Sequence, residues 1–178
     1  AAARIALFSP GELRDRLRAL GSGEAGAARR FTRTSVGFLL VLGPTISVAF
    51  WDWVMSLEPE WYSTMFAVYG FAGTFLGGIA TVTAVALFLD ARGGLPQPLS
   101  AATRHDLGKL LFGFATFWAY IWFCQYLLIW YSNLPEETPY YALRLQGGWT
   151  TLFWLNPVVN FLVPFVILLG SRAKKSPA

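Results

Sequence analysis

The side chains that could move protons in this chain are few, and most lie at the edges of long apolar segments. His105 and Asp106 are adjacent at the entry to one such segment, and Tyr120 lies further along it. At about 100° per residue, Asp106 and Tyr120 share one narrow stripe with Gly113, Cys124 and Tyr131. A polar stripe on a membrane helix normally faces the protein interior, because lipid offers its groups no partner. The pattern predicts an inward-facing proton path that begins at His105 and Asp106.

A simpler interpretation of the same residues stays open. Asp106 places negative charge near the start of a helix, where the helix dipole favours it. Lys109, three residues later, extends its long side chain toward lipid headgroups. On this interpretation the pair has no role in chemistry.

Asp52 is a second candidate for the proton path. It lies between Trp51 and Trp53, near the end of the first apolar segment. A carboxylate inside a membrane is costly and therefore indicates function. The nearby Glu58 favours the alternative, in which Asp52 is a charge at the membrane interface.

Small residues in the second apolar segment predict close helix packing. Gly70, Gly73 and Gly77 share one face, and the last two form a G-x-x-x-G pair, which lets helix backbones approach each other. The alternative is a seat for a flat ligand, such as a quinone ring, or for a lipid. In the last apolar segment Asn156 and Asn160 accompany Pro157 and Pro164, two prolines that remove backbone donors. We expect the two asparagines to satisfy freed carbonyls or to bond a neighbouring helix.

The residues needed for a resident redox centre or an enzyme site are missing. With one His and one Cys the chain offers no bis-His haem site and no iron–sulfur ligand set. It contains no phosphate-binding loop, nucleophile–base pair or zinc spacing. The sequence predicts no catalytic residue, no metal site and no cofactor bound by this chain alone; a quinone or lipid is possible at an interface with partners.

Composition and apolar segments predict an all-α membrane protein. Hydrophobic residues make up 55% of the 178 residues and charged residues 13%, about half the usual share in a soluble domain. Four segments are long enough to cross a bilayer as helices, at about residues 35–57, 62–90, 107–131 and 150–170. We expect a four-helix bundle preceded by a basic arm, residues 1–34, with a short amphipathic helix that carries Leu13, Leu17 and Leu20, and followed by a basic tail, residues 173–178.

Basic residues predict the orientation of these helices. Of the 14 Lys and Arg residues, 13 fall in the arm, in the loop after the second segment and the start of the third, or after the fourth segment, and only Arg144 falls on the opposite side. The positive-inside rule therefore places both termini in the cytoplasm, and we expect a bacterial inner membrane protein. Basic residues at helix ends are explained by topology, which argues against nucleic-acid binding. The opposite side carries Glu58, Glu60, Glu136 and Glu137 among many aromatic residues, as in an interfacial belt.

Two long motifs resemble a known family. They are DWVMSLEPEWYSTMFAVYGFAGTF at residues 52–75 and HDLGKLLFGFATFWAYIWFCQYLLIWYSNLPEET at residues 105–138. Both resemble the membrane subunits of alternative complex III, a bacterial quinol-oxidising complex, and most closely its second polysulfide-reductase-like subunit, called quinone-binding subunit 2. The resemblance covers about residues 30–172. That subunit has two four-helix bundles, so the resemblance implies that this chain corresponds to the C-terminal bundle alone.

The resemblance also implies a function and partners. It implies a non-catalytic membrane subunit of a quinol-oxidising complex, beside other membrane subunits and subunits that carry iron–sulfur clusters and haem. The family's proposed proton-conducting positions match Asp52, His105 and Asp106 here. The alternative is a purely structural accessory subunit that braces a larger respiratory or photosynthetic complex, with pigment-binding partners.

Overall fold

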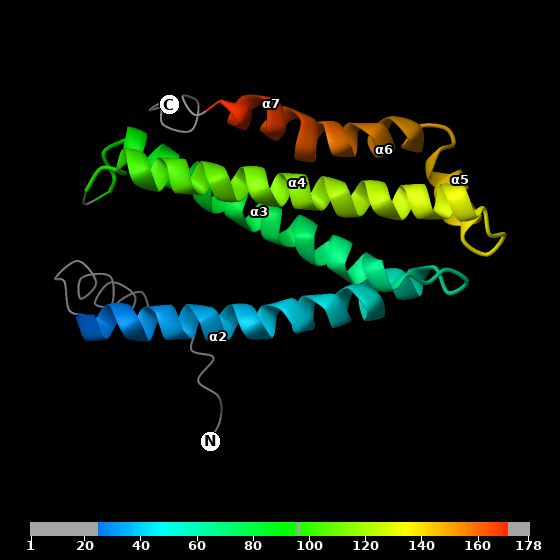
Figure 1. Cartoon of the computed structure of the whole chain (residues 1–178), viewed down its shortest axis with the longest axis horizontal. Coiled ribbons are helices and arrows are strands. Elements are labelled where there is room, and N and C mark those ends of the chain that lie inside the picture. Colours follow the sequence, from blue (N-terminus) through cyan, green and yellow to red (C-terminus); the bar gives the residue numbers. More distant parts are fainter. Residues whose placement is uncertain (1–24, 96, 171–178) are drawn as a thin grey trace, which may run out of the picture. The chain divides into compact units, whose positions relative to one another are not determined.

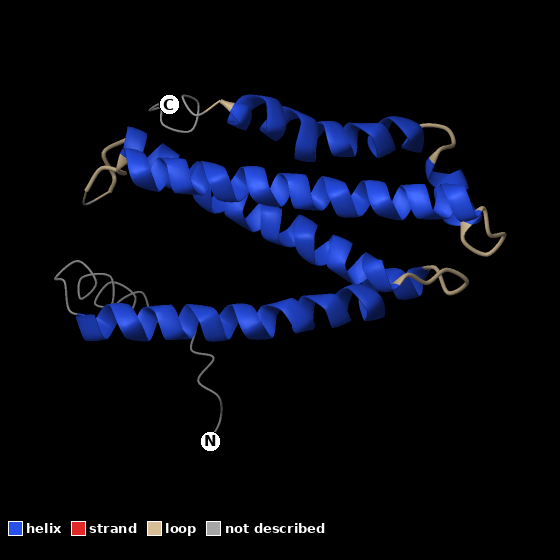
Figure 2. Cartoon of the chain, viewed as in Figure 1, coloured by secondary structure: helices blue, strands red, loops and turns tan. Residues whose placement is uncertain are grey.

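A computed structural model of the chain describes residues 25–95 and 97–170, and the regular structure in these ranges is entirely helical (Figure 2). Four helical stretches are long and apolar enough to cross a membrane: Arg29–Leu57, Thr64–Ala91, Ala101–Ser132 and Trp149–Leu169. The predicted fold class, an all-α membrane protein with four spanning helices, is confirmed. The predicted amphipathic helix around Leu13, Leu17 and Leu20 and the basic tail lie outside the described residues.

The chain divides into two units, Ala1–Thr45 and Ile46–Ala178. In the first unit the described residues belong to α2 (Ala25–Ala49), which contains Pro44 and ends in the second unit. The helix therefore already includes Arg29, Arg30 and Arg33, which were assigned to the basic arm. Its apolar side chains are largely exposed, for example Leu40 at 72%.

In the second unit, α2 passes into a widened π-helical turn, η1 (Phe50–Val54), and a tight 3-10 turn, η2 (Met55–Leu57). Helix α3 (Thr64–Ala91) follows, and then α4 (Ala101–Ser132). Helix α4 begins at Ala101 rather than near residue 107, because Ser100 caps it: the Ser100 hydroxyl accepts a hydrogen bond from the backbone N–H of Thr103 at 3.0 Å. It ends at Asn133, in the left-handed conformation that commonly terminates helices.

Helices α3 and α4 lie side by side (Figure 1) and form the main packed core. Ala72 and Leu76 of α3 and Ala115 and Trp118 of α4 are buried against one another. The two alanines are small enough for the backbones to approach, which is how membrane helices associate.

The segment after α4 packs back along it (Figure 1), mainly through its last two helical elements. A short helix that was not predicted, α5 (Thr138–Arg144), leads to α6 (Trp149–Pro157), a π-helical turn η3 (Val158–Leu162) and α7 (Val163–Leu169). Phe165 stacks on Phe112 of α4 with ring centroids 5.3 Å apart. Pro157 precedes the π-helical turn and Pro164 lies in the first turn of α7, so the helix is irregular where the prolines remove backbone donors.

The two ends of the second unit differ in charge. The basic end, where α3 finishes and α4 begins, carries Arg92, Arg104 and Lys109. There Asp90 joins the two helices: it receives a hydrogen bond from the N–H of Leu99 at 2.9 Å and an ion pair from Arg104 at 3.3 Å. The acidic end, where α3 begins and α4 finishes, carries the four glutamates listed above.

Candidate functional site

A cavity of about 210 Å³ lies at the acidic end, between α3, α4, α5 and α6. We call it the acidic-end cavity. Its polar groups come from Tyr69, Gln125, Arg144 and Asn156. The remaining lining is almost wholly aromatic and consists of Trp122, Tyr140, Tyr141, Trp149, Leu152 and Phe153. A few converging polar groups in an aromatic wall are typical of ligand pockets.

Gln125 is the buried polar residue of this cavity, with 7% of its surface exposed. Its amide nitrogen donates to the Ser63 hydroxyl at 3.4 Å, a long hydrogen bond that joins α4 to the start of α3. A side-chain amide has two donor hydrogens and an acceptor oxygen. The bond to Ser63 uses one donor, which leaves the oxygen and the second hydrogen for a ligand.

Asn156 lines the same cavity from α6 and is held by Asn160. The side-chain nitrogen of Asn160 donates to the backbone oxygen of Asn156 at 3.0 Å and to its side-chain oxygen at 2.6 Å. Asn160 lies in the π-helical turn that follows Pro157. This irregular turn therefore helps to orient the side-chain amide of Asn156 at the cavity.

The cavity wall at α5 is an ordered stack. Tyr140 stacks on Trp61 with ring centroids 3.7 Å apart, and the guanidinium of Arg144 lies 3.5 Å from the centre of the same Tyr140 ring. Arg144 also donates to the backbone oxygen of Tyr140 at 2.7 Å and pairs with Glu58 at 3.5 Å. The indole N–H of Trp61 is buried and has no hydrogen-bond partner among the described residues.

The two tyrosines of α5 remain neutral over a wide pH range. Burial raises the pKa of Tyr140 and of Tyr141 above the ordinary value of 10.0. At Tyr140 the positive charge of Arg144 opposes the shift, and the negative charge of Glu58 adds to it. Both phenols therefore keep their hydrogens at neutral pH and can donate hydrogen bonds.

The four predicted proton-path residues lie elsewhere and are not brought together. Asp52 is exposed in η1 near the acidic end. At the basic end His105 is partly buried, with a buried Nδ1 that has no partner among the described residues, and Asp106 is exposed and paired with Lys109 at 2.7 Å. Tyr120 is 63% exposed on α4, about 21 Å along the helix from Asp106 at 1.5 Å per residue.

The polar stripe of α4 faces away from its packed side. The buried face carries Gly108, Ala115, Trp118, Ile121, Gln125 and Ile129, roughly opposite the stripe at 100° per residue. Asp106, Gly113, Tyr120 and Tyr131 are exposed. These four residues are therefore exposed rather than buried between the helices of the second unit. Small residues such as Ala115 let α3 approach, and close packing decided which face is buried.

The predicted packing residues of α3 differ from one another. A Cβ atom on Gly70 would overlap the Phe50 ring, and one on Gly73 would lie 3.3 Å from the indole nitrogen of Trp118. A Cβ on Gly77 would meet nothing within 4 Å. Gly70 and Gly73 are therefore in tight contacts, whereas Gly77 faces open space.

The sequence interpretation passed over Gln125, Tyr69 and Arg144. A signal for Gln125 was present, because a polar amide in the middle of an apolar segment usually has a function. Gln125 lies on the opposite face of α4 from the predicted polar stripe. Arg144 stood out only as the single Lys or Arg expected on its side, which is an argument about orientation and not about a site.

In comparisons with known proteins, no protein-family model and no curated protein matches this chain.

Proposed function

We propose that this chain is an integral membrane subunit of a bacterial quinol-oxidising complex similar to alternative complex III, in which it supports assembly and offers the acidic-end cavity to a quinone ring. The strongest support for this proposal is that the two motifs that resemble the family, residues 52–75 and 105–138, meet beside the cavity. The first motif contributes Ser63 and Tyr69, and the second contributes Trp122 and Gln125. The hydrogen bond from Gln125 to Ser63 joins them beside the cavity.

The lining of the cavity suits a planar ring with oxygen substituents. Aromatic side chains provide faces for stacking. The amide of Gln125 can accept from a quinol hydroxyl or donate to a quinone carbonyl, and the Tyr69 hydroxyl can do either. At about 210 Å³ the cavity is smaller than the roughly 300 Å³ at which ligand pockets usually begin. It would hold the ring alone, with an isoprenoid tail left in lipid.

In this proposal the chain binds and orients the ring, while electrons pass to partner subunits that carry iron–sulfur clusters and haem. The excess of Lys and Arg would place the basic end and both termini in the cytoplasm of a bacterial inner membrane. The acidic-end cavity would then face the outer side. A proton role for His105 and Asp106 would require groups from partners to bridge the distance to the cavity.

The first test is co-purification after mild detergent extraction. We expect subunits that carry haem and iron–sulfur clusters to accompany the chain, and their absence would contradict membership of such a complex. The second test is quinol oxidation by the purified complex with Gln125→Leu, which keeps the size of the side chain and removes its polar atoms. Loss of a hydrogen bond to the ring should raise KM for quinol about tenfold.

The control for Gln125→Leu is Thr74→Val, a similar polar-to-apolar change at an exposed position of α3. Both complexes should contain the same subunits, so that a difference in KM reports on the cavity. An unchanged KM in an intact Gln125→Leu complex would remove the quinone role and leave the assembly role standing.

The separation of the proton-path residues favours a second candidate, a purely structural accessory subunit of a respiratory or photosynthetic complex. A complex with Asp52, His105 and Asp106 neutralised together would then turn over normally. A complex with Gly70→Leu, which forces Phe50 out of its place on α3, would lose subunits. Pigment-binding proteins among the co-purified partners would support this alternative.

A further inference from the structure

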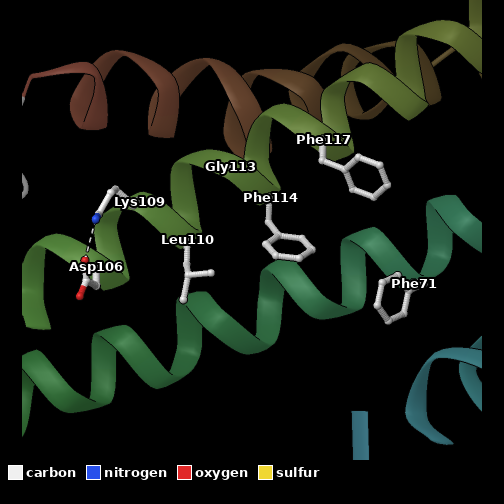
Figure 3. A pocket seen from close by; sticks show the side chains of 7 residues that line it. All are labelled: Phe71, Asp106, Lys109, Leu110, Gly113, Phe114 and Phe117. Atoms are coloured by element: carbon white, nitrogen blue, oxygen red, sulfur yellow. Dashed lines mark ion pairs between the residues drawn. The ribbon is translucent and has the colours of Figure 1, made fainter. Parts of the chain in front are cut away.

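A second hollow lies on the other half of the unit, along α3 and α4 toward the basic end (Figure 3). It has a volume of about 670 Å³, and we call it the α3–α4 groove. Its walls are apolar for most of its length: Leu110, Gly113, Phe114 and Phe117 come from α4, and Phe71 comes from α3. None of the residues that line the acidic-end cavity takes part in it.

One end of the groove is charged. Asp106 and Lys109 line it there, joined by an ion pair of 2.7 Å, and their side chains are 66% and 56% exposed (Figure 3). An ion pair this exposed is weak by itself. Both partners can therefore exchange part of their contact for a ligand that offers the opposite charges.

Along the groove, the charged ion pair is followed by the apolar wall, as headgroups are followed by acyl chains with increasing depth in a bilayer. Asp106 lies in the second turn of α4, about 7.5 Å along the helix from Ala101, and the apolar wall from Leu110 to Phe117 covers about 10 Å more at 1.5 Å per residue. Because α4 is a membrane-spanning helix, the ion pair would lie near headgroup level and the apolar wall beside acyl chains.

The space along the wall is open. A Cβ atom on Gly113 would meet nothing within 4 Å, so the glycine leaves room on the surface of α4. Behind it the Phe114 ring contacts Phe75 of α3, with centroids 4.6 Å apart, and closes the gap between the helices. A slender apolar chain could lie along Gly113 without moving either helix.

We propose that the α3–α4 groove binds one phosphatidylethanolamine molecule, with its ammonium at Asp106, its phosphate at Lys109 and an acyl chain along Gly113. Charge complementarity selects this occupant. Phosphatidylglycerol, which is anionic, would bring its negative charge beside Asp106 without an ammonium to offset it. A choline headgroup has no N–H to donate to the carboxylate, whereas an ethanolamine ammonium has three, and charge-assisted hydrogen bonds are the strong ones.

The test is lipid retention by the purified full chain with any subunits that accompany it. The preparation is depleted of lipid, incubated with phosphatidylethanolamine, phosphatidylcholine or phosphatidylglycerol, and examined by native mass spectrometry. We expect one retained phosphatidylethanolamine per chain. Asp106→Asn should weaken its binding about tenfold, as for loss of one charge-assisted hydrogen bond, and should abolish the preference over phosphatidylcholine.

A second variant tests the acyl-chain part. Gly113→Leu fills the groove at an open position and should reduce retention of phosphatidylethanolamine, whereas Thr116→Val, an exposed position of α4 that does not line the groove, should not. Equal retention of the three lipids by the unaltered chain would overturn the proposal. So would full retention by Gly113→Leu, or the finding that a partner helix or a second copy of the chain covers the groove.

Discussion

The ring of Tyr140 is held between the indole of Trp61 and the guanidinium of Arg144. The ring centroids of Trp61 and Tyr140 are 3.7 Å apart, and the Arg144 carbon is 3.5 Å from the same centre. Since both groups lie that close to one ring centre, they must occupy opposite faces of the ring. The stack fixes α5 to the connection before α3, and Glu58 strengthens it by pairing with Arg144 at 3.5 Å.

Replacing Arg144 should loosen this end of the protein. Arg144→Met keeps much of the apolar stem but loses the cation–π contact, the bond to the backbone oxygen of Tyr140 and the pair with Glu58. We expect a loss of about 1–2 kcal/mol in the free energy of unfolding, most of it from the cation–π contact and the backbone hydrogen bond. Equilibrium unfolding in mixed micelles measures it. Arg92→Met is the matched control, because Arg92 covers only Phe88 of its own helix at 4.2 Å and is exposed.

Alkaline pH should destabilise the acidic end through Tyr141. Burial raises its pKa above 10.0, so above pH 10.0 the unfolded chain releases the phenolic proton before the folded chain does. The folded state then binds more protons than the unfolded state, and stability falls as pH rises. Tyr141→Phe should flatten the fall. A stability curve above pH 10 with the same slope in both proteins would contradict the assignment.

The charges of Arg144 and Glu58 should shift the titration of Tyr140 in opposite directions. Arg144 favours the phenolate of Tyr140 and Glu58 disfavours it, although burial has the larger effect on its pKa. Arg144→Met should therefore move the titration of Tyr140 to still higher pH, and Glu58→Gln should move it to lower pH. Tyrosinate absorbance, taken as the difference from the same variants with Tyr140→Phe, isolates this residue. Shifts of the same sign in both variants would mean that local unfolding, not charge, governs the titration.

Two glycines of α3 should respond in opposite ways to alanine. Gly70→Ala places a methyl group inside the Phe50 ring and should destabilise the protein by about 1–3 kcal/mol, as overpacking does. Gly77→Ala meets no neighbour and should be neutral or stabilising by up to about 1 kcal/mol, because alanine favours helix more than glycine does. Thermal stability in detergent compares them directly. A similar loss in both variants would show that Gly77 also has a tight contact.

The helices could be predicted from the sequence because the length of an apolar segment is a local property. The missing backbone donors at Pro157 and Pro164 could be read from the sequence in the same way, and the π-helical turn η3 follows Pro157. The acidic-end cavity could not be predicted from the sequence, because it depends on α5. This seven-residue helix has no periodic pattern of its own, and it brings Tyr140 onto Trp61. The orientation of α4 also escaped prediction, since polar residues lie on both of its faces, Tyr120 on one and Gln125 on the other, and only packing with α3 distinguishes them.

Burial should decide how strongly each of two ion pairs stabilises the protein: Asp90 of α3 with Arg104 of α4, and Asp106 with Lys109 within α4. The pair of Asp90 with Arg104 has side chains that are 12% and 19% exposed, whereas the pair of Asp106 with Lys109 is more than half exposed. Asp90→Asn keeps an acceptor for the N–H of Leu99 but leaves the Arg104 charge partly buried without its partner, and should cost about 2–3 kcal/mol, somewhat less than a fully buried pair. Asp106→Asn should cost much less, because an exposed ion pair adds little to stability. Chemical unfolding of the two variants at low and high salt measures both, and the smaller loss should vanish at high salt because exposed charges are screened. Equal losses that persist at high salt would mean that the two pairs are buried alike.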